Sequence, residues 1–293
     1  MQTAIVIGGG IADRVLTDSF ETPTMRFLSA GGSVLAEVPL GSSAAATVSR
    51  TVTRSSLYSA LRDEAVRAGV PVLYGKRLVD AHETSDGVVA TFEDGTTATA
   101  DVLIGADGLR SRTRTLIDPA APPARYVGML NVGGYARGVE VAGEPGVMQM
   151  VFGRRCFFGY VVHPNGEVWW FANPISPGEG HGRAMSAMPP HAWRDHLLDL
   201  LSVDDSPAVE LVKATPGLRT GWSTFDFPTV PTWHSDRMVI VGDAAHATSP
   251  SSGQGASQSM WCAVTQAIGS PRRASSLNTT GSTTARRNHP RAL

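Results

Sequence analysis

The chain of 293 residues carries a net charge of −1, from 25 basic and 26 acidic side chains, and 42% of its residues are hydrophobic. This length fits about two domains, and the balanced charge gives no basic field that would attract nucleic acid. The two cysteines, Cys156 and Cys262, offer neither a disulfide framework nor metal-ligand spacing, so we expect no metal site. No apolar run approaches the ~20 residues of a membrane span, and the first residues lack the features of a signal peptide. A cytoplasmic protein without a membrane span is therefore expected.

A glycine-rich turn follows the first predicted strand. Residues 3–7 form a short apolar run, and Gly8 to Gly10 follow at once, like the opening of a dinucleotide-binding G-x-G-x-x-G motif. Glycines there would let the backbone approach a pyrophosphate. The sixth position is Asp13 instead of glycine or alanine, and little room remains for a crossover helix before the next elements. The alternative is an unrelated glycine-rich turn.

Arg54 stands at the start of a predicted helix in the next part of the chain. Residues 25–40 are typical of a hairpin turning at Gly31-Gly32. Ser55 or Ser56 would cap the helix that follows, Gly69 would end it, and residues 70–73 would form a further strand.

Two later segments share one pattern, in which a buried strand ends at an aspartate and small residues. Residues 102–106 end at Asp107-Gly108, and Ser111 would cap the short helix behind them, after a hairpin over residues 88–100. Residues 238–241 end at Gly242-Asp243. Open α/β sheets bind ligands at the carboxyl ends of their strands. We therefore expect the two strand ends to lie side by side and to line a slot for a ligand.

The segment after Asp243 continues with Pro250 and Gly253-Gln254-Gly255, before a possible helix at about residue 256. Between the two strand–turn segments, residues 120–232 are rich in short alternating strands and aromatic side chains. A hairpin turns at residues 164–166, and its period of two places Trp169 and Trp170 on opposite faces. Residues 191–201 are predicted to be helical.

Together these segments resemble the FAD-dependent aromatic hydroxylases, the single-component flavoprotein monooxygenases with a para-hydroxybenzoate hydroxylase-like fold. The family's D-G-x-x-S-x-x-R motif matches at Asp107, Gly108, Ser111 and Arg114, and its second flavin-contacting motif resembles residues 237–257. The resemblance implies an α/β fold: a Rossmann-like FAD-binding domain with an inserted antiparallel β-sheet substrate domain. Residues 1–12, 48–118 and 233–268 would form the FAD-binding domain, which lacks the first crossover helix and second strand. Residues 18–47 and 119–232 would form the substrate domain, and residues 269–293 a disordered tail.

The resemblance also implies a chemistry. FAD would be the cofactor, NADH or NADPH a transient co-substrate, and a flavin hydroperoxide would pass one atom of dioxygen to a small, aromatic substrate. Cofactor contacts would come from Gly8, Gly10, Arg54, Asp107, Gly108, Gly242, Asp243, Pro250, Gly253, Gln254 and Gly255. No side chain is assigned as catalytic, because the flavin carries the difficult steps. Two alternatives stay open: a flavoprotein of this fold with another redox reaction, and a truncated remnant that binds FAD weakly or not at all.

Overall fold

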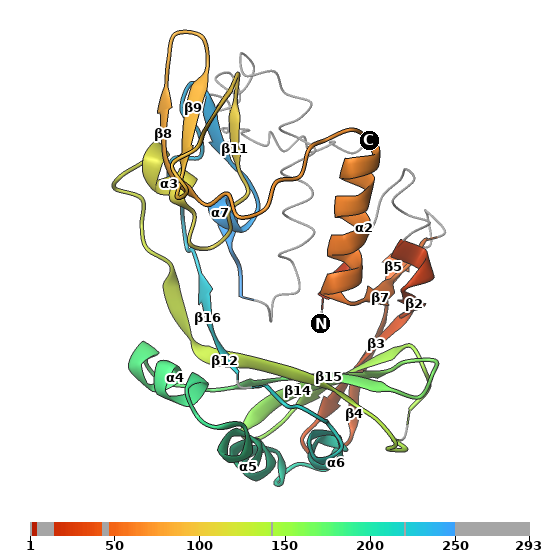
Figure 1. Cartoon of the computed structure of the whole chain (residues 1–293). Helices are drawn as coiled ribbons and strands as arrows, with labels where there is room; N and C mark the ends of the chain where they lie inside the picture. The colour runs from red at the N-terminus through yellow and green to blue at the C-terminus, as the bar shows by residue number, and fades with distance from the viewer. Residues whose placement is uncertain (1, 5–14, 43–46, 142, 220, 250–293) are drawn as a thin grey trace, which may run out of the picture. The chain divides into compact units, whose positions relative to one another are not determined.

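The structure is a computed structural model, and it describes residues 2–4, 15–42, 47–141, 143–219 and 221–249 (Figure 1). The chain divides into two compact units. The first combines residues 1–76, 122–229 and 246–257, and the second combines residues 77–121, 230–245 and 258–293. Residues 48–76 and 77–118 thus fall in different units, and the domain boundaries inferred from the sequence stay a prediction.

The first unit is built around a seven-stranded sheet. Its order is β16-β12-β15-β14-β13-β3-β4. Neighbouring strands are antiparallel, except that β13 runs parallel to β3. In chain order the strands are β3 (Thr24–Ser29), β4 (Val34–Pro39), β12 (Arg125–Ala136), β13 (Val147–Phe152), β14 (Cys156–Val162), β15 (Val168–Pro174) and β16 (Trp222–Asp226). The predicted hairpins over residues 25–40 and across residues 164–166 are confirmed.

Helices cover one face of this sheet. Figure 1 shows α4 (Glu179–Ser186), α5 (Pro190–Leu201) and α6 (Ala208–Lys213) together on that side. Trp193, Leu197 and Leu211 from these helices are fully buried in the same core as Trp170. On the opposite face Trp169 packs with Phe20. The predicted placement of the two tryptophans on opposite faces is confirmed, as is the helix over residues 191–201.

The first unit also contains smaller sheets and the helix that begins at Arg54. A three-stranded sheet has the order β1-β7-β2, formed by β1 (Gln2–Ala4), β7 (Arg50–Val52) and β2 (Phe20–Glu21), and β5 (Gly41–Ser42) pairs with β6 (Thr47–Val48). The helix α2 (Arg54–Arg67) follows β7 directly.

Two sequence expectations around α2 were wrong. Its N-cap is Thr53, whose hydroxyl accepts a hydrogen bond from the Ser56 backbone N–H, so neither Ser55 nor Ser56 caps it. No strand forms at residues 70–73, because Pro71 has no N–H to donate and no strand of the described part pairs with this exposed segment. Gly69 does end the helix as predicted, with a φ of 80°.

The described part of the second unit contains two sheets and two short helices. The strands β8 (Leu78–Glu83), β9 (Val88–Phe92) and β10 (Thr97–Ala100) form an antiparallel sheet, and β11 (Leu103–Gly105) pairs in parallel with β17 (Met238–Ile240). The helices are α3 (Arg112–Ile117) and α7 (Asp243–His246). Ala81, Val88 and Met238 form a buried cluster that joins the two sheets. Among the described helices of the chain, none is both long and apolar enough to span a membrane.

Candidate functional site

The two strand ends expected to be neighbours are adjacent in the structure. In the parallel pair, Leu103 lies opposite Met238 and Gly105 opposite Ile240. The Val241 N–H donates a 3.0 Å hydrogen bond to the Gly105 carbonyl, so the pairing continues to the end of both strands. The chain then leads into Asp107 on one strand and Asp243 on the other, and the predicted adjacency of the strand ends is confirmed.

Gly105 allows α3 to pack directly against the end of β11. A Cβ atom at Gly105 would lie 2.5 Å from the Thr113 Cβ, closer than real Cβ atoms approach. Thr113 is buried. Any larger residue at position 105 would therefore push α3 away from the strand.

The carboxylate of Asp107 caps α3. Its Oδ1 accepts a 2.5 Å hydrogen bond from the Ser111 hydroxyl, and its Oδ2 accepts from the backbone N–H groups of Arg112 at 2.8 Å and Thr113 at 3.0 Å. Burial alone would raise the pKa of Asp107, but the hydrogen bonds from Ser111 and Thr113 outweigh it and hold the pKa below its ordinary value. Ser111 also caps the helix as predicted, accepting from the Arg114 N–H. Asp107 thus builds the turn, and its contact with a cofactor stays a prediction.

Arg114 links this turn to the second motif. Its side chain is buried, with 5% of the residue's surface exposed. Nη1 donates a 2.9 Å hydrogen bond to the Ala244 carbonyl, and Nη2 donates a 2.9 Å hydrogen bond to the Leu109 carbonyl. Burial lowers the pKa of Arg114, and the nearby charge of Asp107 acts in the opposite direction. Sequence reasoning missed this link, since no local pattern indicates a contact across the intervening chain.

Gly242 and Asp243 form the turn after β17. Gly242 is buried and has a φ of 59°, a conformation that glycine adopts without strain. The short helix α7 begins at once with Asp243, whereas the sequence placed a helix only at about residue 256, outside the described residues. Asp243 is exposed, and no hydrogen bond or ion pair ties its carboxylate to any described residue. Asp107 is thus bonded within its own turn, whereas among the described residues the Asp243 carboxylate accepts no hydrogen bond.

Of the remaining predicted site residues, the structure describes Gly108 and Arg54. Gly108 belongs to the same turn as Asp107 and has a φ of 75°. Arg54 is the first residue of α2 in the other compact unit; it is exposed, and its guanidinium has no partner among the described residues. Six predicted positions lie outside the described residues: Gly8, Gly10, Pro250, Gly253, Gln254 and Gly255.

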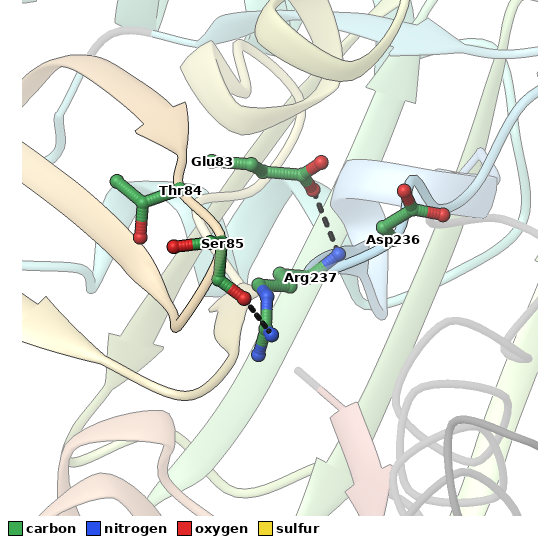
Figure 2. A pocket seen from close by; sticks show the side chains of 5 residues that line it. All are labelled: Glu83, Thr84, Ser85, Asp236 and Arg237. Atoms are coloured by element: carbon green, nitrogen blue, oxygen red, sulfur yellow. Dashed lines mark hydrogen bonds between the residues drawn. The ribbon is translucent and has the colours of Figure 1, made fainter.

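A polar pocket lies at the other end of β17 (Figure 2). It has a volume of about 470 Å³ and is lined by Glu83, Thr84, Ser85, Asp236 and Arg237. Glu83 accepts hydrogen bonds from the Ser235 hydroxyl at 2.6 Å and the Arg237 N–H at 2.7 Å, and the Arg237 guanidinium donates to the Ser85 carbonyl at 2.8 Å. These bonds fasten the β8–β9 turn to the start of β17. The pocket precedes the strand, whereas Asp243 follows it, so this pocket is separate from the predicted cofactor site.

Comparison with protein families matches residues 5–265 to a family described as FAD binding domain. The chain belongs to the FAD-dependent aromatic hydroxylase family. The resemblance carried by the sequence motifs is therefore confirmed.

Several curated relatives in this family are monooxygenases. A FAD-dependent urate hydroxylase of Mycolicibacterium vanbaalenii is 30% identical over 208 residues, covering 65% of this chain and 48% of the relative. A 6-hydroxynicotinate 3-monooxygenase of Pseudomonas fluorescens is 30% identical over 243 residues, covering 78% of this chain and 60% of the relative. The matched part of the chain thus spans about half the length of the first of these proteins and somewhat more of the second.

Solved flavoprotein structures share the fold. A Klebsiella pneumoniae HpxO variant complexed with FAD is 25% identical, with a TM-score of 0.72 over 86% of this chain and 65% of that one. The 2,6-dihydroxypyridine-3-hydroxylase of Arthrobacter nicotinovorans has a TM-score of 0.71 at 20% identity, covering 92% of this chain and 75% of that one. The predicted α/β flavoprotein fold is confirmed.

Proposed function

We propose that this chain carries an FAD-dependent monooxygenase activity that hydroxylates a small, aromatic substrate with dioxygen and NADH or NADPH. The overall reaction balances when the substrate gains one oxygen atom and the other becomes water. NAD(P)H supplies two electrons and one proton, and solvent supplies the second proton. FAD, when bound, supplies the redox chemistry between the nicotinamide and dioxygen.

One observation carries the proposal: the parallel pairing of β11 with β17 joins the two family motifs at one sheet edge. A flavin needs hydrogen-bond acceptors for its ribityl hydroxyls and a cation for its pyrophosphate. The exposed carboxylate of Asp243 suits the first requirement, and the guanidinium of Arg54 matches a phosphate bidentately. Both side chains lack partners among the described residues, which supports a role for them toward a ligand.

The turn glycines contribute through the backbone. Gly108 and Gly242 both have positive φ values, of 75° and 59°. A Cβ added at Gly108 would meet nothing within 4 Å, so this turn leaves room for close approach by a planar ring or a phosphate. No side chain has to act as a nucleophile, so the residues bind and orient the cofactor and exclude water.

The substrate class rests on an aromatic surface in the first unit. Phe27 stacks on Phe152 at a centroid distance of 6.0 Å, Phe152 contacts Phe157 at 5.3 Å, and Phe157 contacts Phe171 at 5.9 Å. Phe152 keeps 51% of its surface exposed. Flat aromatic side chains favour planar apolar ligands through stacked and edge contacts. The names of two relatives include urate and 6-hydroxynicotinate, which are planar ring compounds.

The test has three readouts on purified protein supplied with FAD. The proposal expects a protein-bound flavin spectrum, oxidation of NADH or NADPH that candidate rings such as urate and 6-hydroxynicotinate stimulate, and a product that contains one atom of isotopically labelled dioxygen. Bound flavin with nicotinamide oxidation but no labelled product from any accepted substrate would favour another redox reaction on this fold.

A specific observation also favours the non-catalytic alternative. Asp13 interrupts the N-terminal motif, and β1 pairs antiparallel with β7, with Thr3 opposite Thr51, instead of extending the parallel pair of β11 and β17. A chain without the complete motif would bind FAD weakly. Colourless protein and an unchanged melting temperature at excess FAD would support this alternative and contradict the monooxygenase proposal.

A further inference from the structure

We propose that Arg114 is a positioning residue, which holds the first turn of α7 and thereby sets the place of the Asp243 carboxylate. This inference rests on the proposed FAD site for its functional meaning, but the structural link can be measured without the cofactor. Arg114 would act through Ala244 and would not touch a ligand itself, because only 5% of its surface is exposed.

The link is a bridge between two carbonyl groups. The guanidinium donates 2.9 Å hydrogen bonds both to Leu109, in the turn after β11, and to Ala244, the residue next to Asp243. The rigid fork of a guanidinium can donate to the two carbonyl groups together. A lysine ammonium is a single centre on a flexible stem and lacks that fork.

The helix that carries Arg114 is itself held in place by hydrogen bonds. Arg114 lies in α3, whose first turn is fixed by the Asp107 carboxylate and by the Ser111 hydroxyl. The close approach of Thr113 to Gly105 sets the helix against β11. Asp107 therefore affects Asp243 through a physical chain of contacts: the cap, the helix, Arg114 and the Ala244 carbonyl.

Two variants test the bridge, with a matched control on the same helix. Arg114→Gln removes the forked donor, Arg114→Lys keeps the charge, and Arg112→Gln removes an exposed arginine that donates a 2.8 Å hydrogen bond to the Val79 carbonyl. Hydrogen exchange of backbone amides over residues 238–247 is measured on the FAD-free proteins. We expect roughly 10-fold faster exchange there in both Arg114 variants, with exchange over residues 147–174 unchanged, since a hydrogen bond from a charged donor is lost. Arg112→Gln should match the unaltered protein in both regions.

The functional readouts are a titration with FAD and, at saturating FAD, the visible circular dichroism of the bound flavin. We expect a roughly 10- to 100-fold weaker FAD affinity in both Arg114 variants and an altered visible circular dichroism of the bound flavin. A loss of stability alone would not produce the spectral change in saturated protein. Should Arg114→Gln fail to fold, Arg114→Lys decides the question. Unchanged exchange over residues 238–247 in a folded Arg114 variant would overturn the proposal, as would equal effects of the Arg112 control. If the unaltered chain does not bind FAD, the monooxygenase proposal fails, while the exchange data still decide whether Arg114 holds α7.

Discussion

Gly105 and Ile240 lie opposite each other in the parallel pair of β11 and β17, and each is followed within three residues by an aspartate. The two aspartates follow neighbouring strands, but they differ in their hydrogen bonds. Asp107 accepts hydrogen bonds from its own helix, whereas Asp243 is exposed and has no partner among the described residues. The first therefore shapes the turn, and the second is the acid that we propose as a ligand contact.

Asp243→Asn is expected to weaken FAD binding by roughly 10- to 100-fold, because hydrogen bonds to a charged acceptor are about twice as strong as neutral ones. The free energy of unfolding without FAD should change by less than about 0.5 kcal/mol, since the side chain is exposed and unpartnered among the described residues. Fluorescence titration with FAD and urea unfolding measure the two quantities. The control is Asp236→Asn, an exposed aspartate before β17, which should leave FAD affinity unchanged. Equal affinities in all three proteins would remove Asp243 from the site.

Asp107→Ala is expected to lower the free energy of unfolding by about 0.5–2 kcal/mol, the usual contribution of a helix cap. The effect should depend on pH. The folded-state pKa of Asp107 is below its ordinary value, so its contribution is complete above the unfolded-state value of about 3.9 and is lost as the pH falls through the folded pKa. Urea unfolding at neutral and acidic pH checks this. Asp80→Ala, at an exposed position on β8, is the control. A stability difference between Asp107→Ala and the unaltered protein that grows toward low pH would contradict this sign.

Gly105→Ala is expected to destabilise the second unit by about 1–3 kcal/mol, because the added methyl group overlaps Thr113. The matched change is Gly180→Ala in α4, where an added Cβ meets nothing within 4 Å. Alanine there should be neutral or stabilising, as alanine favours helices over glycine. Chemical unfolding of both variants provides the measurement, and equal stabilities would show that α3 does not depend on the close approach at Gly105.

Local sequence patterns were sufficient to predict the two strand–turn motifs and the hairpins. Apolar runs ended by Asp107-Gly108 and Gly242-Asp243 indicated two strands, and the family resemblance implied that they are neighbours, as their parallel pairing shows. The first run was expected to be buried, but Ile104 is 62% exposed, so that part of the prediction was wrong. The hairpin predicted over residues 88–100 corresponds to the pairing of β9 with β10, which the register of Thr97 opposite Thr91 confirms.

Local sequence patterns could not predict contacts between segments that are distant in the sequence. Nothing near Arg114 in the sequence indicates that it donates to Ala244, and nothing in residues 24–29 indicates parallel pairing with residues 147–152. Residues 70–73 have the composition of a strand but lack a partner in the described part, and composition alone cannot supply one. The cap of α2 was assigned too late in the chain, since Thr53, Ser55 and Ser56 all have suitable hydroxyl groups.

Cys156 is expected to resist alkylation in the folded protein. The thiol is buried, with 2% of the residue's surface exposed, and burial raises its pKa to about 12. At about pH 8 it therefore stays protonated, and the thiolate is the reactive form. Peptide mass spectrometry after treatment with iodoacetamide should find Cys156 unmodified in buffer and modified in urea. Rapid modification in buffer would show that the core of the seven-stranded sheet opens readily.

The central claim is that the edge formed by β11 and β17 belongs to an FAD site, and titration of the purified chain with FAD tests it most directly. We expect saturable binding with a protein-bound flavin spectrum, and a stabilisation of about 2.7 kcal/mol when free FAD is about 100 times the dissociation constant. A spectrum identical to free FAD, together with an unchanged melting temperature at excess cofactor, would contradict the claim.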